Sequence, residues 1–206
     1  MSPDSFSAQL ARDVSRETFE KLDAYVAILL SENQKQNLIS KGSEAEVWER
    51  HILDSAQLVQ FADEGVTSCV DIGAGAGLPG IVLSILTDHD ITMIEPRPLR
   101  TAFLNSVIDR LDLRNAHIVQ GKADSVTREF DVITGRAVAP LARFLSLSHH
   151  LSTEKTRWVL PKGRKVLHEL EDARRLWQLE VTVAPSMTDD DARILVIDRA
   201  VRKGRA

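Results

Sequence analysis

The stretch Val70–Gly80, VDIGAGAGLPG, places four glycines and a proline directly after a short run of apolar residues. The segment Ser68–Ile72 predicts a buried strand. Pro79 predicts the start of a helix over Pro79–Leu86, because proline lacks an N–H that the first helical turn leaves unbonded anyway. Glycine permits positive φ angles and a close approach of the backbone to a ligand. A strand, a sharp turn and a helix N-terminus in this order are typical of the cofactor-binding turn of α/β proteins.

Strand-like and helical segments alternate over the rest of the chain. Seven apolar segments predict strands: Ser68–Ile72, Ile91–Ile94, His117–Val119, Asp131–Ile133, Trp158–Leu160, Leu179–Val183 and Ile194–Ile197. Four segments predict helices between most of them: Pro79–Leu86, Leu99–Leu111, Leu141–His149 and Lys165–Trp177. This alternation predicts a mostly parallel seven-stranded sheet with helices on both faces. Because only a loop separates the last two predicted strands, we expect them to form an antiparallel hairpin at the C-terminal end.

The first 64 residues follow a different pattern, with apolar residues at helical spacing. One such stripe predicts an amphipathic helix over Ser15–Leu30, with Ser15 as its N-cap. Another predicts a helix over Ser43–Phe61, which ends before Gly65. We therefore expect an N-terminal helical extension over residues 1–64, packed on a sheet domain over residues 65–206.

Composition narrows the class of protein further. A chain of 206 residues suffices for one α/β domain with a helical extension. The single cysteine, Cys69, excludes an internal disulfide and a cysteine-based zinc site, and we expect no metal. No apolar run is long enough to span a bilayer, and the N-terminus lacks the apolar core of a secretory signal. We therefore expect a cytoplasmic protein without a membrane partner.

Two cofactor-binding templates fit the glycine stretch equally well. Counted from Gly75, the stretch matches G-x-G-x-x-G, the turn of dinucleotide-binding domains. Counted from Asp71, it matches D-x-G-x-G-x-G, the turn of methyltransferases that use S-adenosylmethionine. Glu95, at the end of the next predicted strand, is placed to bind the ribose hydroxyls of either cofactor.

Three features outside the glycines favour S-adenosylmethionine. Asp71 precedes the first glycine, where a carboxylate suits the methionine amino group. Asp124, in the segment Gly121–Asp124 after the third predicted strand, is placed to accept a hydrogen bond from the adenine amino group. The chain ends in a hairpin and has no second domain for a hydride acceptor. The sequence therefore predicts a Rossmann-like class I S-adenosylmethionine-dependent methyltransferase.

The kind of methyl acceptor is narrowed by residues that are absent. Cys69 lies inside the first predicted strand, so it does not suit covalent addition to a pyrimidine ring. The segment Thr134–Pro140 lacks the Asn/Asp-Pro-Pro-aromatic motif of enzymes that methylate exocyclic amines. Lys162 is a candidate for activating a ribose hydroxyl, but no Lys-Asp-Lys-Glu set accompanies it. A nucleophile with its own lone pair, such as guanine N7, needs no general base, so we predict no catalytic residue beyond those that position the reactants.

Six segments form a combination that is more specific than any of them alone: Asn37–Ile39, Arg50–Ser55, Asp71–Ile81, Arg97–Leu104, Arg136–Leu141 and Leu160–Gly163. Together they resemble the bacterial GidB family of small-subunit ribosomal RNA guanine-N7 methyltransferases. The resemblance implies that the protein transfers a methyl group from S-adenosylmethionine to N7 of a guanine in 16S ribosomal RNA (guanine 527 in the family's usual ribosomal RNA numbering). S-adenosylhomocysteine is then the product, and 16S ribosomal RNA or the small ribosomal subunit is the partner. We expect the protein to act as a monomer.

The resemblance and the glycine template together give a set of predicted cofactor-binding residues. The set is Asp71, Gly73, Gly75, Gly77, Leu78, Glu95, Ala123, Asp124 and Arg136. Family members often have threonine where this chain has Ile39, and many have glutamate where it has Asp124. The shorter aspartate has less reach toward the adenine. Arg136 directly follows a predicted strand, which favours a role in the site over a purely structural ion pair.

Basic side chains near the site suit a phosphate-rich substrate, although any one basic cluster is more often an ordinary solvated surface. The candidates for RNA contact are Arg50, His51, Arg97, Arg100, Lys162 and Arg164. His51 and Asp54 share one helical face and could instead bond each other. The alternative function is an S-adenosylmethionine-binding regulatory protein that methylates no RNA. A third interpretation, an NAD-dependent reductase, predicts binding of nicotinamide instead.

Overall fold

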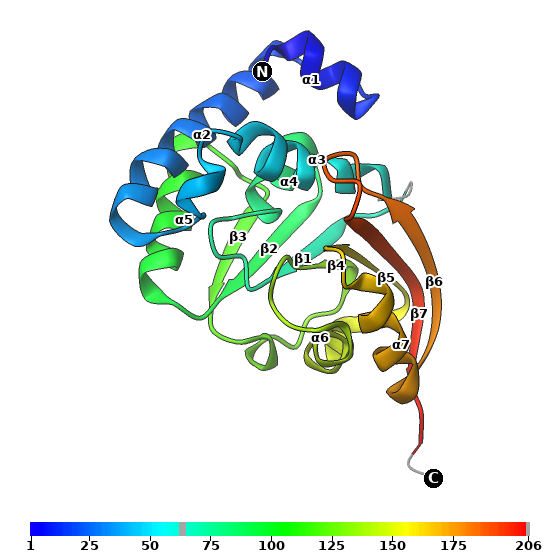
Figure 1. Ribbon diagram of the computed structural model, residues 1–206. Helices are drawn as coiled ribbons and strands as arrows, with labels where there is room; N and C mark the ends of the chain where they lie inside the picture. The colour runs from blue at the N-terminus through cyan, green and yellow to red at the C-terminus, as the bar shows by residue number, and fades with distance from the viewer. Residues whose placement is uncertain (62–64, 205–206) are drawn as a thin grey trace.

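The computed structural model describes residues 1–61 and 65–204 of the chain. Within them, seven strands form one sheet in the order β3-β2-β1-β4-β5-β7-β6 (Figure 1). The strands are β1 (Ser68–Ile72), β2 (Asp90–Glu95), β3 (Ala116–Gln120), β4 (Phe130–Thr134), β5 (Ser152–Lys162), β6 (Trp177–Pro185) and β7 (Arg193–Arg202). The predicted domain boundary follows residue 64, which lies outside the described residues, and the division into two domains stays a prediction.

The direction of the strands confirms the predicted α/β fold with its C-terminal antiparallel hairpin. Strands β1 to β5 pair in parallel, whereas β7 is antiparallel to both β5 and β6. The chain order turns back between β1 and β4, and sheets of this kind bind ligands at the carboxyl ends of the strands beside such a reversal. Asp71 of β1 lies at that place, opposite Met93 of β2 and Thr134 of β4.

Helices cover both faces of the sheet, as the alternation predicts (Figure 1). One face packs against α4 (Gly80–Leu86), α5 (Pro98–Leu111) and the N-terminal extension, and the other against α6 (Leu141–Ser148) and α7 (Val166–Leu176). Neighbouring residues of a strand point to opposite faces, so Cys69 belongs to the first core and Val70 to the second. Burial raises the pKa of the Cys69 thiol, which is consistent with a packing role.

The extension begins with two helices along one side of the sheet domain, α1 (Pro3–Leu10) and α2 (Arg16–Gln36) (Figure 1). The Ser15 hydroxyl accepts a hydrogen bond from the Thr18 N–H, which confirms Ser15 as the N-cap of α2. Helix α1 was not predicted from the sequence, although Ser2 caps it and Pro3 stands in its first turn. No helix among the described residues is both long enough and apolar enough to cross a membrane.

The single helix predicted over Ser43–Phe61 is wrong. The segment contains a π-helical turn (Trp48–Leu53), the short helix α3 (Asp54–Ala56) and a 3-10 turn (Gln57–Phe61). Side chains bond two of its backbone carbonyls: Arg136 donates to the carbonyl of Arg50 at 3.2 Å, and Gln57 to that of Asp54 at 3.1 Å. These bonds compete with the regular helical ladder, and such irregular turns are frequent at functional sites.

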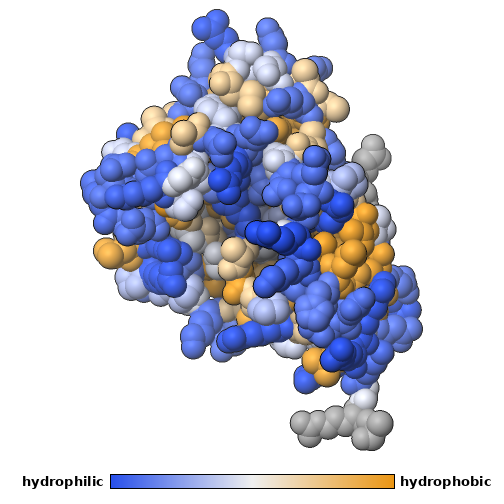
Figure 2. All heavy atoms as spheres, in the orientation of Figure 1, coloured by the Kyte–Doolittle hydropathy of each residue, from blue (hydrophilic) through white to orange (hydrophobic). Residues whose placement is uncertain are grey.

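Hydrophilic side chains cover most of the face shown in Figure 2, with an apolar area toward the edge formed by β6 and β7. Val183 on β6 is 37% exposed. The central strands β1, β2 and β4 are almost entirely buried, and the candidate site lies at their carboxyl ends.

Candidate cofactor and substrate site

The glycine turn after β1 is tied to the sheet by its first two amides. Gly73 and Ala74 donate to the carbonyl of Ile94 on β2, at 2.8 and 3.1 Å. The backbone has positive φ at Gly73, Gly75 and Gly77, as the glycine template requires. A Cβ on Gly77 would lie 2.4 Å from the Ile81 side chain, so only glycine lets helix α4 pack this closely on the turn.

Glu95 fixes the turn from the end of β2. Its carboxylate is buried, and its Oε2 accepts from the Gly75 N–H at 2.9 Å. Its Oε1 accepts from the Arg97 N–H at 2.9 Å, at the start of α5. Each carboxylate oxygen can accept more than one hydrogen bond, so the predicted contact with ribose hydroxyls remains compatible with this geometry.

Asp71 has a buried carboxylate whose two oxygen atoms differ in their hydrogen bonds. It is fully buried, and its Oδ2 accepts from the Gly80 N–H at 2.8 Å, whereas its Oδ1 has no hydrogen-bond partner among the described residues. Burial raises the pKa of Asp71 to about 6, although the Gly80 N–H and the charge of Arg136 act to lower it. A buried acceptor without a donor is costly in free energy. The amino group of S-adenosylmethionine would supply that donor and a compensating charge, so this site fits the predicted cofactor.

Arg136 follows β4 and bonds the extension through its guanidinium. Its Nη1 donates to Oδ2 of Asp54 at 3.1 Å and to the carbonyl of Arg50 at 3.2 Å, and its Nη2 bonds Nδ1 of His51 at 3.0 Å. The Arg136 and Asp54 side chains are 21% and 17% exposed. The structural ion pair considered for Arg136 is therefore present, and its contact with the cofactor stays a prediction.

The His51 ring is neutral and is hydrogen-bonded to both Arg136 and Ser43. Burial, followed by the positive charges of Arg136 and Arg50, lowers the pKa of His51 to about 4. Because Nδ1 accepts from Arg136, the ring proton lies on Nε2, which donates to the Ser43 hydroxyl at 2.8 Å. His51 and Asp54 were predicted to have the option of bonding each other, but here both bond Arg136 instead.

Asp54 also reaches the loop between β6 and β7. Its Oδ1 accepts from the Thr188 hydroxyl at 3.1 Å and from Gln57 at 2.9 Å. A groove beside it has Arg50, Asp54, Arg136, Lys162, Thr188 and Arg193 among its lining residues. The contact between Asp54 and Thr188 was not predicted from the sequence, because no local pattern joins residues 134 positions apart.

The predicted RNA-contact residues differ in how free their side chains are. Lys162 is only 11% exposed, and its ammonium bonds Glu169 at 2.9 Å and the carbonyl of Ala139 at 3.2 Å, so it supports the loop after β4. Arg97 and Arg164 are exposed beyond the ends of β2 and β5. Arg100 lies against the glycine turn, with Nη1 3.4 Å from where a Cβ on Gly75 would be. RNA contact by each of these residues stays a prediction.

The residues after β3 and after the glycine turn complete the site. Ala123 is buried in a 3-10 turn, and its carbonyl bonds Nε2 of His150 at 3.0 Å, whereas Asp124 is exposed. Leu78 is buried in the glycine turn. The predicted cofactor residues therefore lie at the carboxyl ends of β1 and β2 or in the turns that follow β1, β3 and β4. Among the described residues, no three His, Cys, Asp or Glu side chains are grouped as metal ligands would be.

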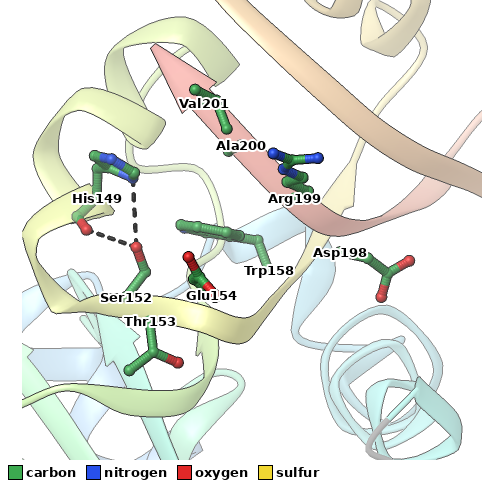
Figure 3. A pocket seen from close by; sticks show the side chains of 9 residues that line it. All are labelled: His149, Ser152, Thr153, Glu154, Trp158, Asp198, Arg199, Ala200 and Val201. Atoms are coloured by element: carbon green, nitrogen blue, oxygen red, sulfur yellow. Dashed lines mark hydrogen bonds between the residues drawn. The ribbon is translucent and has the colours of Figure 1, made fainter.

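A second hollow lies away from this site, where β5 and β7 diverge (Figure 3). Trp158 lies in its middle, and His149 and Ser152 lie to one side. Ser152 Oγ is 3.4 Å from Nδ1 of His149, but it donates to the His149 carbonyl at 2.6 Å. The hydroxyl proton is therefore committed to a local turn, and this pair does not form an activated nucleophile.

The strand order, the glycine turn and the buried carboxylate of Asp71 define the class: Rossmann-like S-adenosylmethionine-dependent methyltransferases. Within this class, the sequence model of GidB, described as rRNA small subunit methyltransferase G, matches residues 18–195. This chain belongs to the GidB family. The family resemblance noted in the sequence is thus confirmed.

Sequence relatives agree with this assignment, and solved structures agree with the fold. Ribosomal RNA small subunit methyltransferase G of Erythrobacter litoralis is 42% identical over 179 residues, or 86% of each chain. The protein of the same name from Zymomonas mobilis is 38% identical over 191 residues, which cover 89% of this chain and 86% of the relative. A SAM-dependent methyltransferase from Aquifex aeolicus has a TM-score of 0.57 at 16% identity, covering 76% of this chain and 94% of its own. Fibrillarin from Aeropyrum pernix, solved with natively bound S-adenosyl-L-methionine, has a TM-score of 0.50 at 16% identity, covering 66% of this chain and 67% of its own. At these identities, the structural likeness concerns the fold.

Proposed function

We propose that this protein transfers the methyl group of S-adenosylmethionine to N7 of a guanine in 16S ribosomal RNA of the small ribosomal subunit. The observation that carries the proposal is the buried Oδ1 of Asp71 beside the glycine turn, which has no hydrogen-bond partner in the described parts of a chain of the GidB family. The names of the relatives supply the ribosomal RNA substrate class. We also propose that the protein acts in the cytoplasm as a monomer.

The cofactor-holding roles follow from the chemistry of each residue. Asp71 accepts from the ammonium group of the methionine end, and the backbone of the glycine turn approaches the cofactor closely because it lacks side chains. Glu95 accepts from the ribose hydroxyls, and Asp124 from the adenine amino group. Arg136 completes the site from the loop after β4. When bound, the cofactor supplies an electrophilic methyl group on a sulfonium centre.

The methyl acceptor needs little help from the protein beyond position. Guanine N7 has an available lone pair and loses no proton when it is methylated, so no general base is required. The basic groups nearest the groove agree with this: Lys162 is ion-paired to Glu169, and His51 has both ring nitrogens bonded. The side chains therefore act by orienting the guanine in line with the methyl group.

The substrate side combines the groove with the basic residues at the rim of the site. Arg50 is the candidate at the groove itself, because its side chain forms only an exposed ion pair with Glu46 among the described residues. Arg97, Arg100 and Arg164 are the candidates beside the glycine turn and beyond β5. Such residues contact phosphates and thereby fix the register of the RNA. His51 acts through Arg136, and Lys162 through the loop after β4.

A methyl-transfer assay tests the proposal. Purified protein and labelled S-adenosylmethionine are mixed with 16S ribosomal RNA or small subunits from cells that lack the gene. We expect one methyl group per RNA at a guanine N7, and none with Arg136→Ala. Full transfer by Arg136→Ala would remove that residue from the site. Binding of S-adenosylmethionine without methylation of either RNA substrate would support the regulatory alternative.

A further inference from the structure

The helical extension reaches the glycine turn through one buried tyrosine. Tyr25 stands in the middle of α2 and is fully buried. Its hydroxyl donates to the carbonyl of Ala76, in the centre of the turn, at 2.7 Å. The two residues are 51 positions apart, so this bond joins the extension to the turn that follows β1.

The Ala76 carbonyl belongs to a peptide unit that is fixed at both ends. The N–H of the same planar unit, that of Gly77, donates to the carbonyl of Ala74 at 2.7 Å. Ala76 is only 5% exposed, so its carbonyl has little access to water if the tyrosine hydroxyl is removed. The direction of this peptide plane therefore depends on a side chain of the extension.

The other fixed points of the turn come from the sheet domain. Ile94 holds Gly73 and Ala74, and Glu95 holds Gly75. Tyr25 supplies the matching contact from the extension, on the side of the turn that continues into Leu78 and α4. Burial raises the pKa of Tyr25 well above its ordinary value, so the hydroxyl remains a donor throughout the physiological range.

We propose that Tyr25 is a positioning residue for S-adenosylmethionine, which sets the conformation of residues 75–77 from the helical extension. This inference rests on the proposed cofactor site and goes beyond it, because it makes the extension part of that site as well as of the RNA-binding surface. The extension thus has two proposed functions. Arg50 contacts RNA at the groove, and the buried face of α2 orders the turn that holds the cofactor.

The test compares two substitutions at neighbouring buried positions of α2. Tyr25→Phe removes the hydroxyl and keeps the ring, whereas Val26→Ala, at the next buried position, removes two methyl groups with no bond to the turn. Both variants are expected to lower the melting temperature. Isothermal titration with S-adenosylhomocysteine and amide hydrogen exchange of the unliganded protein are then measured on both.

We expect Tyr25→Phe to raise the Kd for S-adenosylhomocysteine about tenfold and to speed exchange of the Gly77 amide, because one buried hydrogen bond to the turn is lost. Val26→Ala should leave the Kd within about twofold of the wild type and the Gly77 amide protected. In the methylation assay, Tyr25→Phe should raise KM for S-adenosylmethionine and leave KM for RNA unchanged.

A wild-type Kd in Tyr25→Phe would overturn the inference, whatever its melting temperature. So would an increase in Kd that Val26→Ala matches, since the effect would then follow stability alone. If the wild-type protein bound no S-adenosylhomocysteine, the proposed function would fail, and the role of Tyr25 in cofactor binding would fail with it. An unchanged Gly77 exchange rate with normal wild-type binding would overturn only the inference about Tyr25.

Discussion

At the scale of single residues, Asp71 lowers the stability of the unliganded fold, and the proposed contact with the cofactor would offset this cost. Its carboxyl is buried, and the charges of Arg136 and Glu95 act on it with opposite signs. Burial raises its pKa from 3.8 to about 6, so ionised Asp71 lowers the stability of the unliganded fold as the pH rises through that interval. A bound ammonium group favours the ionised form, and binding therefore releases the proton when the pH is below about 6.

This sign gives a pH prediction. The affinity for S-adenosylhomocysteine should rise with pH up to about 6 and level off above it, and it should fall by up to tenfold for each pH unit below. Asp71→Asn should abolish this pH dependence and weaken binding at pH 7 at least tenfold, because it removes a charge-assisted hydrogen bond. Titration calorimetry from pH 5 to pH 8 measures both effects.

The same substitution should stabilise the unliganded protein. Asparagine keeps an oxygen for the Gly80 N–H but carries no buried charge, so urea denaturation at pH 7 should show a gain of about 1–3 kcal/mol. Weaker binding together with lower stability would instead indicate that Asp71 acts by packing.

Gly77 gives a further prediction about a single residue. Alanine there would need a φ of +89° and a Cβ 2.4 Å from the Ile81 side chain, so Gly77→Ala should cost about 2–4 kcal/mol of unfolding free energy. Gly163→Ala is the matched control, since no atom lies within 4 Å of its added Cβ. Equal denaturation midpoints for the two variants would contradict the packing described for the turn.

At the scale of the elements, the prediction of a single helix over residues 43–61 was wrong. Its apolar spacing is helical, but Arg136 bonds Asp54, His51 and the carbonyl of Arg50. Arg136 follows the carboxyl end of β4, which belongs to the sheet and lies far along the chain from this segment. Local spacing contains no information about such a partner, and tertiary bonds override helical propensity here. The strands and the glycine turn were predictable because period, β-branched residues and glycine spacing are local signals.

A substitution of Asp54 tests how the segment 43–61 is held, because Asp54 bonds both Arg136 and Thr188. Asp54→Ala leaves a largely buried guanidinium without its carboxylate, and we expect a loss of about 2–4 kcal/mol in unfolding free energy together with a strong decrease in methyl transfer. Glu46→Ala removes the exposed partner of Arg50, 3.4 Å away, and should change stability by less than about 0.5 kcal/mol. Similar losses in both variants would show that Asp54 is an ordinary surface charge.

At the scale of the whole molecule, the topology follows from the alternation of strands and helices, and the site follows from the place where strand order reverses. The candidate cofactor residues could be placed there from sequence, since each lies at the end of a predicted strand or in the turn after one. Tyr25 could not, because a buried tyrosine in an apolar stripe is indistinguishable in sequence from any core aromatic residue. Lys162 was predicted beside the RNA, and only the structure shows its bond to Glu169.

The charge distribution of the whole molecule gives a prediction about RNA binding. The net charge is −4, so attraction to RNA must come from local basic residues at the rim of the site. Replacing Arg97 and Arg164 with alanine should reduce the slope of log K against log salt by about 1.5–2 and leave the Kd for S-adenosylhomocysteine unchanged. The control replaces Arg114 and Arg175, two exposed arginines in other parts of the surface, and should keep the wild-type slope.

The most direct test of the central claim is to map N7-methylguanine in 16S ribosomal RNA from cells with and without the gene. Borohydride reduction and aniline treatment cleave RNA at this base, and primer extension locates the cut. We predict one cleavage, at the guanine that the family resemblance implies (guanine 527), in RNA from cells with the gene. The cleavage should be lost on deletion and return with the wild-type gene but not with the Arg136→Ala gene. An identical cleavage pattern in the presence and absence of the gene would contradict the proposed activity.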